Sequence, residues 1–150
     1  MKLAFTLVEL ILVIVILGIL AAVAIPRLVA TRNDAHVAVL ARQIKSATDE
    51  ITSYVFSQMK TEDNLSKMSN IVSELEAEGI AKIDKNEKKA TIKIGDIDDC
   101  IVMQIKSGNN EENLTLTAND PDDDIECKGV QHLINFKNYP IVLRGQLVKF

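Results

Sequence analysis

Two cysteines and two histidines are the residues of this 150-residue chain best suited to catalysis or metal binding. Cys100 and Cys127 lack the short spacing of metal-ligand pairs. His36 falls in a stretch with helical periodicity, and His132 has no acidic residue that the sequence marks as its partner. The sequence therefore predicts no nucleophile with an adjacent base, and we expect no active site.

Acidic residues crowd one short stretch in the second half of the chain. Asp120, Asp122, Asp123, Asp124 and Glu126 place five carboxylates within seven residues. Carboxylates this close repel one another unless water or a cation screens them. Calcium takes roughly six to eight oxygen ligands, so the stretch is a candidate calcium site, although its spacing is not that of an EF-hand. The alternative is a solvated acidic loop without metal.

Another residue with chemical meaning is Glu9, which has apolar neighbours on both sides. A carboxylate costs about 2.5 to 3.5 kcal/mol at the centre of a membrane helix and less near the interface, so an acidic residue in such a segment suggests a function. Its own helix offers no nearby cation, because Lys2 and Arg27 lie seven and eighteen residues away. We expect Glu9 to pair with a cation on a neighbouring copy. The alternative is a side chain that reaches the membrane interface.

The segment that must position Glu9 is the run from Phe5 to Ile25. Its 21 residues include only two markedly polar ones, Thr6 and Glu9. A helix of this length measures roughly 31 Å, about the thickness of a bilayer's hydrocarbon core. Helix is the expected state, because a helix satisfies its own backbone hydrogen bonds in lipid.

The first thirty residues carry a specific motif. Residues 4–9 read AFTLVE, and an unbroken apolar segment follows, with Gly18 inside it and AVAIP at residues 22–26. This pattern resembles the N-terminus of type IV pilins and of type II secretion pseudopilins. The resemblance implies a leader at residues 1–4, cleavage between Ala4 and Phe5, N-methylation of Phe5, and Glu9 as the carboxylate that guides assembly. The family usually has glycine before the cut, where this chain has Ala4.

For the whole protein, the resemblance implies a structural, non-enzymatic subunit of a type IV pilus-like filament. We expect a pseudopilin of a type II secretion or DNA-uptake system. The implied partners are other copies of the chain, related pilin-like subunits, the prepilin peptidase, the inner-membrane assembly platform and membrane lipid. The implied location is the bacterial inner membrane, with a single span and a periplasmic head, before extraction into a periplasmic or surface filament. A net charge of −4 argues against a nucleic-acid partner.

Other interpretations remain open. A surface type IV pilus subunit would show the same features. Ala22-Val23-Ala24 is also an A-x-A pattern, so a conventional signal peptidase would cut after Ala24 and release a secreted binding module. An enzyme tethered by the apolar segment would need a convergent catalytic group, and the rest of the chain shows no such motif.

Beyond Ile25 the apolar pattern narrows to one face of a helix. Pro26 is expected to kink this helix without ending it, because helical spacing resumes after it and prolines are tolerated within membrane helices. The apolar stripe continues to about Gln58 and consists of Val37, Leu40, Ile44, Ala47, Ile51 and Tyr54 or Val55. We predict one kinked helix, with a membrane half at 5–25 and an amphipathic half at 26–58.

Residues 59–150 are expected to form a globular head. A short helix is predicted from Leu65 to Leu75, with Asn64 as its cap and Gly79 after its end. Apolar residues then alternate with polar ones, which predicts antiparallel strands. The predicted strands are Ala90–Ile94, Ile101–Lys106, Leu114–Thr117 and either Pro140–Leu143 or Leu147–Phe150. The predicted class is α+β, with the long helix packed on a small antiparallel sheet, as in the pilin fold.

In a head that lies outside the cytoplasm, Cys100 and Cys127 are predicted to form one disulfide. Closing that loop would stabilise the head by roughly 3 to 4 kcal/mol in the chain-entropy model. The alternative is a pair of free buried thiols in a cytoplasmic protein.

Overall fold

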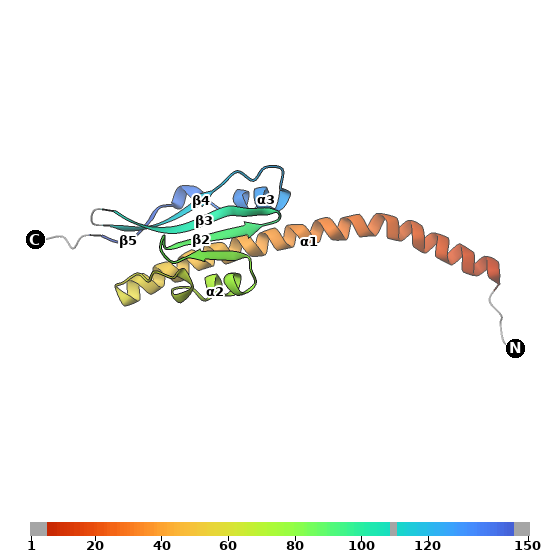
Figure 1. Ribbon diagram of the computed structural model, residues 1–150. Coiled ribbons are helices and arrows are strands. Elements are labelled where there is room, and N and C mark those ends of the chain that lie inside the picture. Colours follow the sequence, from red (N-terminus) through yellow and green to blue (C-terminus); the bar gives the residue numbers. More distant parts are fainter. Residues whose placement is uncertain (1–5, 109–110, 146–150) are drawn as a thin grey trace, which may run out of the picture. The chain divides into compact units, whose positions relative to one another are not determined.

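The chain forms two compact units, Met1–His36 and Val37–Phe150, and helix α1 (Leu7–Gln58) contributes to both. The computed structural model describes residues 6–108 and 111–145. The predicted cleavage site at Ala4 and Phe5 and the alternative strand at Leu147–Phe150 therefore lie outside the described residues. The predicted α+β class is confirmed, because α1 packs on a five-stranded antiparallel sheet (Figure 1).

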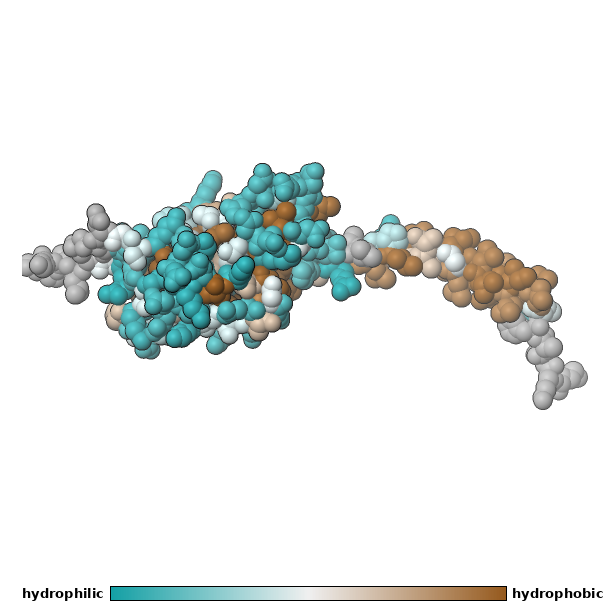
Figure 2. All heavy atoms as spheres, viewed as in Figure 1, coloured by the Kyte–Doolittle hydropathy of each residue, from teal (hydrophilic) through white to brown (hydrophobic). Residues whose placement is uncertain are grey.

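The first part of α1 exposes apolar side chains on all sides. Between Leu7 and Leu28 the large apolar side chains are 45–74% exposed, and Figure 2 shows this stretch as a hydrophobic surface. The predicted continuation of the helix past Pro26 is confirmed, while the kink there stays a prediction. The helix is long and apolar enough to cross a membrane, a criterion that a signal sequence near this end of the chain also meets.

From Val37 to Gln58, α1 is amphipathic and supplies one side of the core of the head. The predicted stripe is confirmed, because Leu40, Ile44, Ala47, Ile51 and Val55 are all at most 3% exposed. Val55 is the stripe residue at the end of the helix, whereas Tyr54 is half-buried. These side chains pack in one cluster with the inner face of the sheet, which is what holds this part of the helix on the head.

The predicted helix at Leu65–Leu75 is two separate helices, which corrects the sequence analysis. Asn64 caps a short 3-10 helix, η1 (Leu65–Lys67), and α2 (Asn70–Ala77) begins after its N-cap Ser69. The Ser69 hydroxyl accepts from the backbone N–H of Val72 (3.1 Å) and donates to Glu50 Oε2 (2.7 Å). A carboxylate of α1 thus helps to decide where α2 begins.

In the part of the chain that the structure describes, the sheet contains five strands in the order β1-β2-β3-β4-β5, and all neighbours are antiparallel. The strands are β1 (Ala81–Asp84), β2 (Lys89–Ile94), β3 (Ile97–Ser107), β4 (Glu112–Ala118) and β5 (Ile141–Arg144). The three predicted central strands are confirmed within β2, β3 and β4, and the predicted strand at Pro140–Leu143 overlaps β5. Strand β1 was not predicted, because its four residues are too few to show a clear alternation.

Two further elements between β4 and β5 were not predicted. They are α3 (Ile125–Leu133) and a 3-10 helix, η2 (Phe136–Asn138). Helix α3 buries Cys127 and Val130 completely. It lies close to α1 at Gly129, where a Cβ atom would come within 2.9 Å of a methyl group of Val37. Glycine at this position therefore permits the two helices to approach.

Candidate assembly site and the disulfide-linked loop

Glu9 forms a capping box with Thr6 at the N-terminus of α1. The Thr6 hydroxyl accepts a hydrogen bond from the Glu9 N–H (3.2 Å). In return, Glu9 Oε2 accepts from the Thr6 N–H (2.9 Å) and from the Thr6 hydroxyl (2.7 Å). The box satisfies two N–H groups that the start of a helix leaves without partners. It also places the carboxylate at the positive end of the helix dipole.

The capping box changes what is expected of Glu9 within a single chain. An unpaired carboxylate in lipid is costly, and the hydrogen bonds from Thr6 reduce that cost without a second copy. This capping role was not predicted, although T-x-x-E before an apolar run is a known signature of a helix start. Pairing of Glu9 with a neighbouring copy stays a prediction, and it must compete with the capped state.

Cys100 and Cys127 form the predicted disulfide. Cys100 lies on β3 and Cys127 lies in the first turn of α3, with their Cα atoms 5.9 Å apart. That separation is typical of disulfides. Both residues are fully buried, so the bond fastens α3 to the sheet inside the core of the head.

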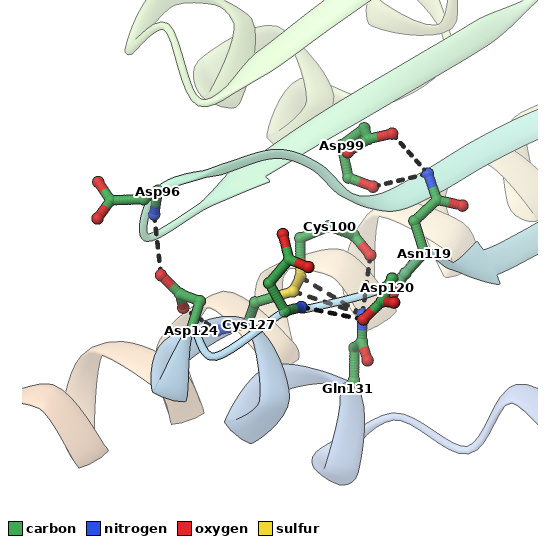
Figure 3. The surroundings of a disulfide bond; sticks show 9 residues. Asp96, Asp99, Cys100, Asn119, Asp120, Asp124, Cys127 and Gln131 are labelled. Carbon is green, nitrogen blue, oxygen red and sulfur yellow. Dashed lines mark hydrogen bonds between the residues drawn. A yellow bond between two sulfur atoms is a disulfide. The ribbon is translucent and has the colours of Figure 1, made fainter.

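Gln131 and Asn119 hold the chain that the disulfide closes into a loop (Figure 3). Gln131 Nε2 donates to the carbonyl oxygens of Cys100 (3.0 Å) and Asn119 (2.8 Å). Asn119 Nδ2 donates to the carbonyl oxygen (3.0 Å) and to Oδ2 (2.8 Å) of Asp99. Gln131 lies one helical turn after Cys127, and its role was not predicted because α3 was not predicted.

Asp124 is the N-cap of α3 and also contacts the turn between β2 and β3. Its Oδ1 accepts from the Cys127 N–H (2.7 Å), and its Oδ2 accepts from the Asp96 N–H (2.9 Å). Gly95 permits this approach, because its φ is 59° and a Cβ atom there would overlap the Asp124 carboxylate. The N–H of Cys127, and after it the N–H of Asp96, holds the pKa of Asp124 below its usual value.

The five predicted calcium ligands do not share one partner in the structure. Asp120 accepts a hydrogen bond from the Asp122 N–H (3.0 Å), Asp123 pairs with a lysine of α3 (3.4 Å), and Asp124 caps that helix. Glu126 lies in the first turn of α3. Within residues 6–108 and 111–145, no group of three or more His, Cys, Asp or Glu side chains is placed to hold a metal ion. The acidic stretch forms a turn and the start of a helix, and calcium binding there stays a prediction.

We expect Asp124→Asn to destabilise the head by about 1 kcal/mol at pH 7. Asparagine can still cap α3 with its oxygen, but its Nδ2 would then face the Asp96 N–H. Because the folded-state pKa of Asp124 is lowered, the stability that its charge contributes is present above the unfolded-state pKa of about 3.9. That stability is lost as the pH falls through the lower folded-state pKa. Urea unfolding of the full chain in detergent should show a difference that shrinks at acid pH.

Asp123→Asn is the matched control, because the Asp123 side chain is fully exposed. It should leave the free energy of unfolding unchanged at both pH values. An Asp124→Asn difference of equal size at neutral and at acid pH would contradict the charge argument. In that case the geometry of the Asp124 side chain, and not its charge, would account for the difference in the free energy of unfolding.

Two features of the described residues therefore bear on function. One is the apolar start of α1 with its capped Glu9, and the other is a disulfide-linked loop that presents acidic residues at the start of α3. Comparison with protein-family models, with curated proteins and with solved structures finds no match to this chain.

Proposed function

We propose that this chain is a structural subunit of a type IV pilus-like filament, assembled from the inner membrane through residues 5–25. On its modest size and single disulfide loop, we assign it to the pseudopilins of type II secretion or DNA-uptake systems. The observation that carries the proposal is α1, one continuous helix that exposes its large apolar side chains from Leu7 to Leu28 and is amphipathic from Val37 to Gln58. A subunit that is first held in lipid and later bundled with copies needs both kinds of surface.

The exposed apolar part of α1 needs a covering that residues 6–108 and 111–145 do not supply. None of its most apolar 18-residue window is buried within the described residues. The head has a separate core of its own, to which α1 contributes only from Val37 onward. Lipid and a bundle of like helices both cover such a surface, which is why the same segment serves as anchor and as filament core.

A polar group must guide the step from lipid to bundle. Apolar helices gain little hydrophobic energy by leaving lipid for one another, so packing and polar contacts decide how they associate. In the described part of this span, Glu9 is the acidic residue. We propose that its carboxylate pairs with the α-amino group of Phe5 on a neighbouring subunit and exchanges some of its bonds to Thr6 for that contact.

The mass of the mature N-terminal peptide from the native host tests the proposal. We expect a peptide that begins at N-methylated Phe5, because the prepilin peptidase would cut after Ala4 and methylate the new terminus. A mature chain that begins at Ile25 would mean that the apolar segment is an export signal. The filament proposal would then be wrong, and a secreted binding module would replace it.

Electron microscopy of the cell surface separates the two kinds of filament. For a pseudopilin we expect no long surface fibres that bind an antibody against the head. Long labelled fibres that disappear on deletion of the gene would identify a surface type IV pilus subunit instead.

A further inference from the structure

A groove of about 310 Å³ lies between α1 and the segment that joins α3 to β5. Its apolar lining includes Ala38 and Ala41 of α1 and Leu133 at the end of α3. Tyr139 also lines it, and the Tyr139 hydroxyl lies 3.1 Å from the hydroxyl of the buried Thr48. That hydrogen bond holds the ring in place, so the groove is formed before anything binds in it.

Two cations, Arg42 and Lys45, line the same groove. They are three residues apart on α1, so both lie on one face of the helix. Both side chains are exposed, and neither forms an ion pair with a carboxylate of residues 6–108 or 111–145. An apolar lining beside two cations suits an apolar side chain with carboxylates next to it.

An exposed apolar side chain with adjacent carboxylates is present at the start of α3. Ile125, the first residue of the helix, is 84% exposed, and the two residues Asp122 and Asp123 just before it are exposed as well. A single exposed isoleucine is ordinary on a protein surface. This one is held rigidly, because Asp124 caps the helix beside it and the disulfide fastens Cys127 two residues later.

We propose that the groove of one copy binds the acidic turn, residues 122–125, of a second copy. Ile125 would enter the apolar part of the groove, while Asp122 and Asp123 would lie against Arg42 and Lys45. A turn that is already rigid loses little entropy on binding. Opposite charges would set the orientation of the two copies.

The contact joins two different surfaces of the chain, so it is heterologous. A heterologous contact that does not close into a ring repeats from copy to copy and builds a helical filament. In this respect the inference rests on the proposed function, since a helical filament is built from heterologous contacts between copies. The proposed contact identifies which two surfaces of the head would bind each other.

Photocrosslinking of the full-length chain in its native membranes tests the contact. A photoreactive phenylalanine analogue at position 125 should give a two-copy product. Peptide mapping should place the bond in Ala38–Lys45 or Leu133–Tyr139 of the other copy. The matched control carries the analogue at Val142, which is 52% exposed on β5 and does not line the groove. Absence of the two-copy product, or crosslinks only to lipid, to another protein or to another part of the chain, would overturn the inference.

Exchange of charges provides a second measurement. Arg42→Glu and Asp123→Lys should each lower the yield of the two-copy product about tenfold, because each places like charges together. The combination should recover most of the yield, since the opposite charges then face each other again. Circular dichroism of each variant shows whether the head is still folded. Single variants that crosslink like the parent, or a combination no better than the singles, would count against the contact.

The contact and the proposed function can fail separately. A mature N-terminus at Phe5 without the two-copy product would overturn the contact and leave the filament proposal in place. The two-copy product from a chain that begins at Ile25 would support the contact and overturn the filament proposal.

Discussion

Glu9→Gln is expected to lower the yield of assembled filaments roughly 30-fold or more. Glutamine keeps the length of the side chain, and its oxygen can still accept the Thr6 N–H, because glutamine serves in a capping box as glutamate does. The charge is lost, so the amino group of Phe5 on the neighbouring copy would stay unpaired in an apolar bundle. Removing one partner of such a pair costs on the order of 2 to 5 kcal/mol. The measurement is the amount of the chain in isolated filaments relative to the total in the cell.

Thr6→Ala is the matched variant, because it keeps the Glu9 charge and removes the hydroxyl that caps α1. It should weaken the first turn of the helix by about 1 kcal/mol and leave assembly largely intact. If Glu9→Gln assembles normally while Thr6→Ala does not, Glu9 acts as a capping residue and the pairing proposal is wrong.

Loss of the disulfide is expected to give the largest change in stability. The double variant Cys100→Ala and Cys127→Ala should lose roughly 3 to 4 kcal/mol, because the bond closes a loop with a sequence separation of 27. For a head of this size the melting temperature should fall on the order of 10 to 20 °C. Thermal unfolding of the full chain in detergent, followed by circular dichroism, measures the change. The parent chain under reducing conditions should match the variant.

The effect of the missing disulfide should also be uneven across the head. Helix α3 is held by the disulfide, by Gln131 and by its cap, whereas β2, β3 and β4 pair along their length. Amide hydrogen exchange should therefore accelerate most in Ile125–Leu133 and least in the central strands. Equal melting temperatures for variant and parent, with unchanged exchange in α3, would contradict a stabilising role for the bond. Gly129→Ala is the control for a packing defect, because it crowds Val37 but leaves the disulfide intact. Comparing its hydrogen exchange with that of the cysteine variant separates the effect of poor packing from the effect of losing the cross-link.

The sequence by itself determined α1, through a long apolar run followed by an amphipathic stripe, and the alternation of apolar residues determined the centre of the sheet. The stripe from Leu40 to Val55 and the alternation in β2, β3 and β4 each reflect one face buried in a single core, and burial of one face is what periodicity records. The disulfide could be predicted because the chain has only two cysteines. The capping box is equally local, because T-x-x-E before an apolar run is visible in the sequence.

Only the tertiary structure decided the start of α2, the existence of α3 and the groove beside it. Ser69 begins α2 together with Glu50, a residue nineteen positions earlier in the sequence. Helix α3 is short and exposes Ile125 and Leu133, which blurs its apolar face, and contacts with β3 hold it in place. Asp124 could serve as a calcium ligand in sequence, but the backbone of Asp96 takes up its carboxylate. Each of these features depends on contacts between residues that are far apart in the sequence. A local sequence pattern does not reveal such contacts.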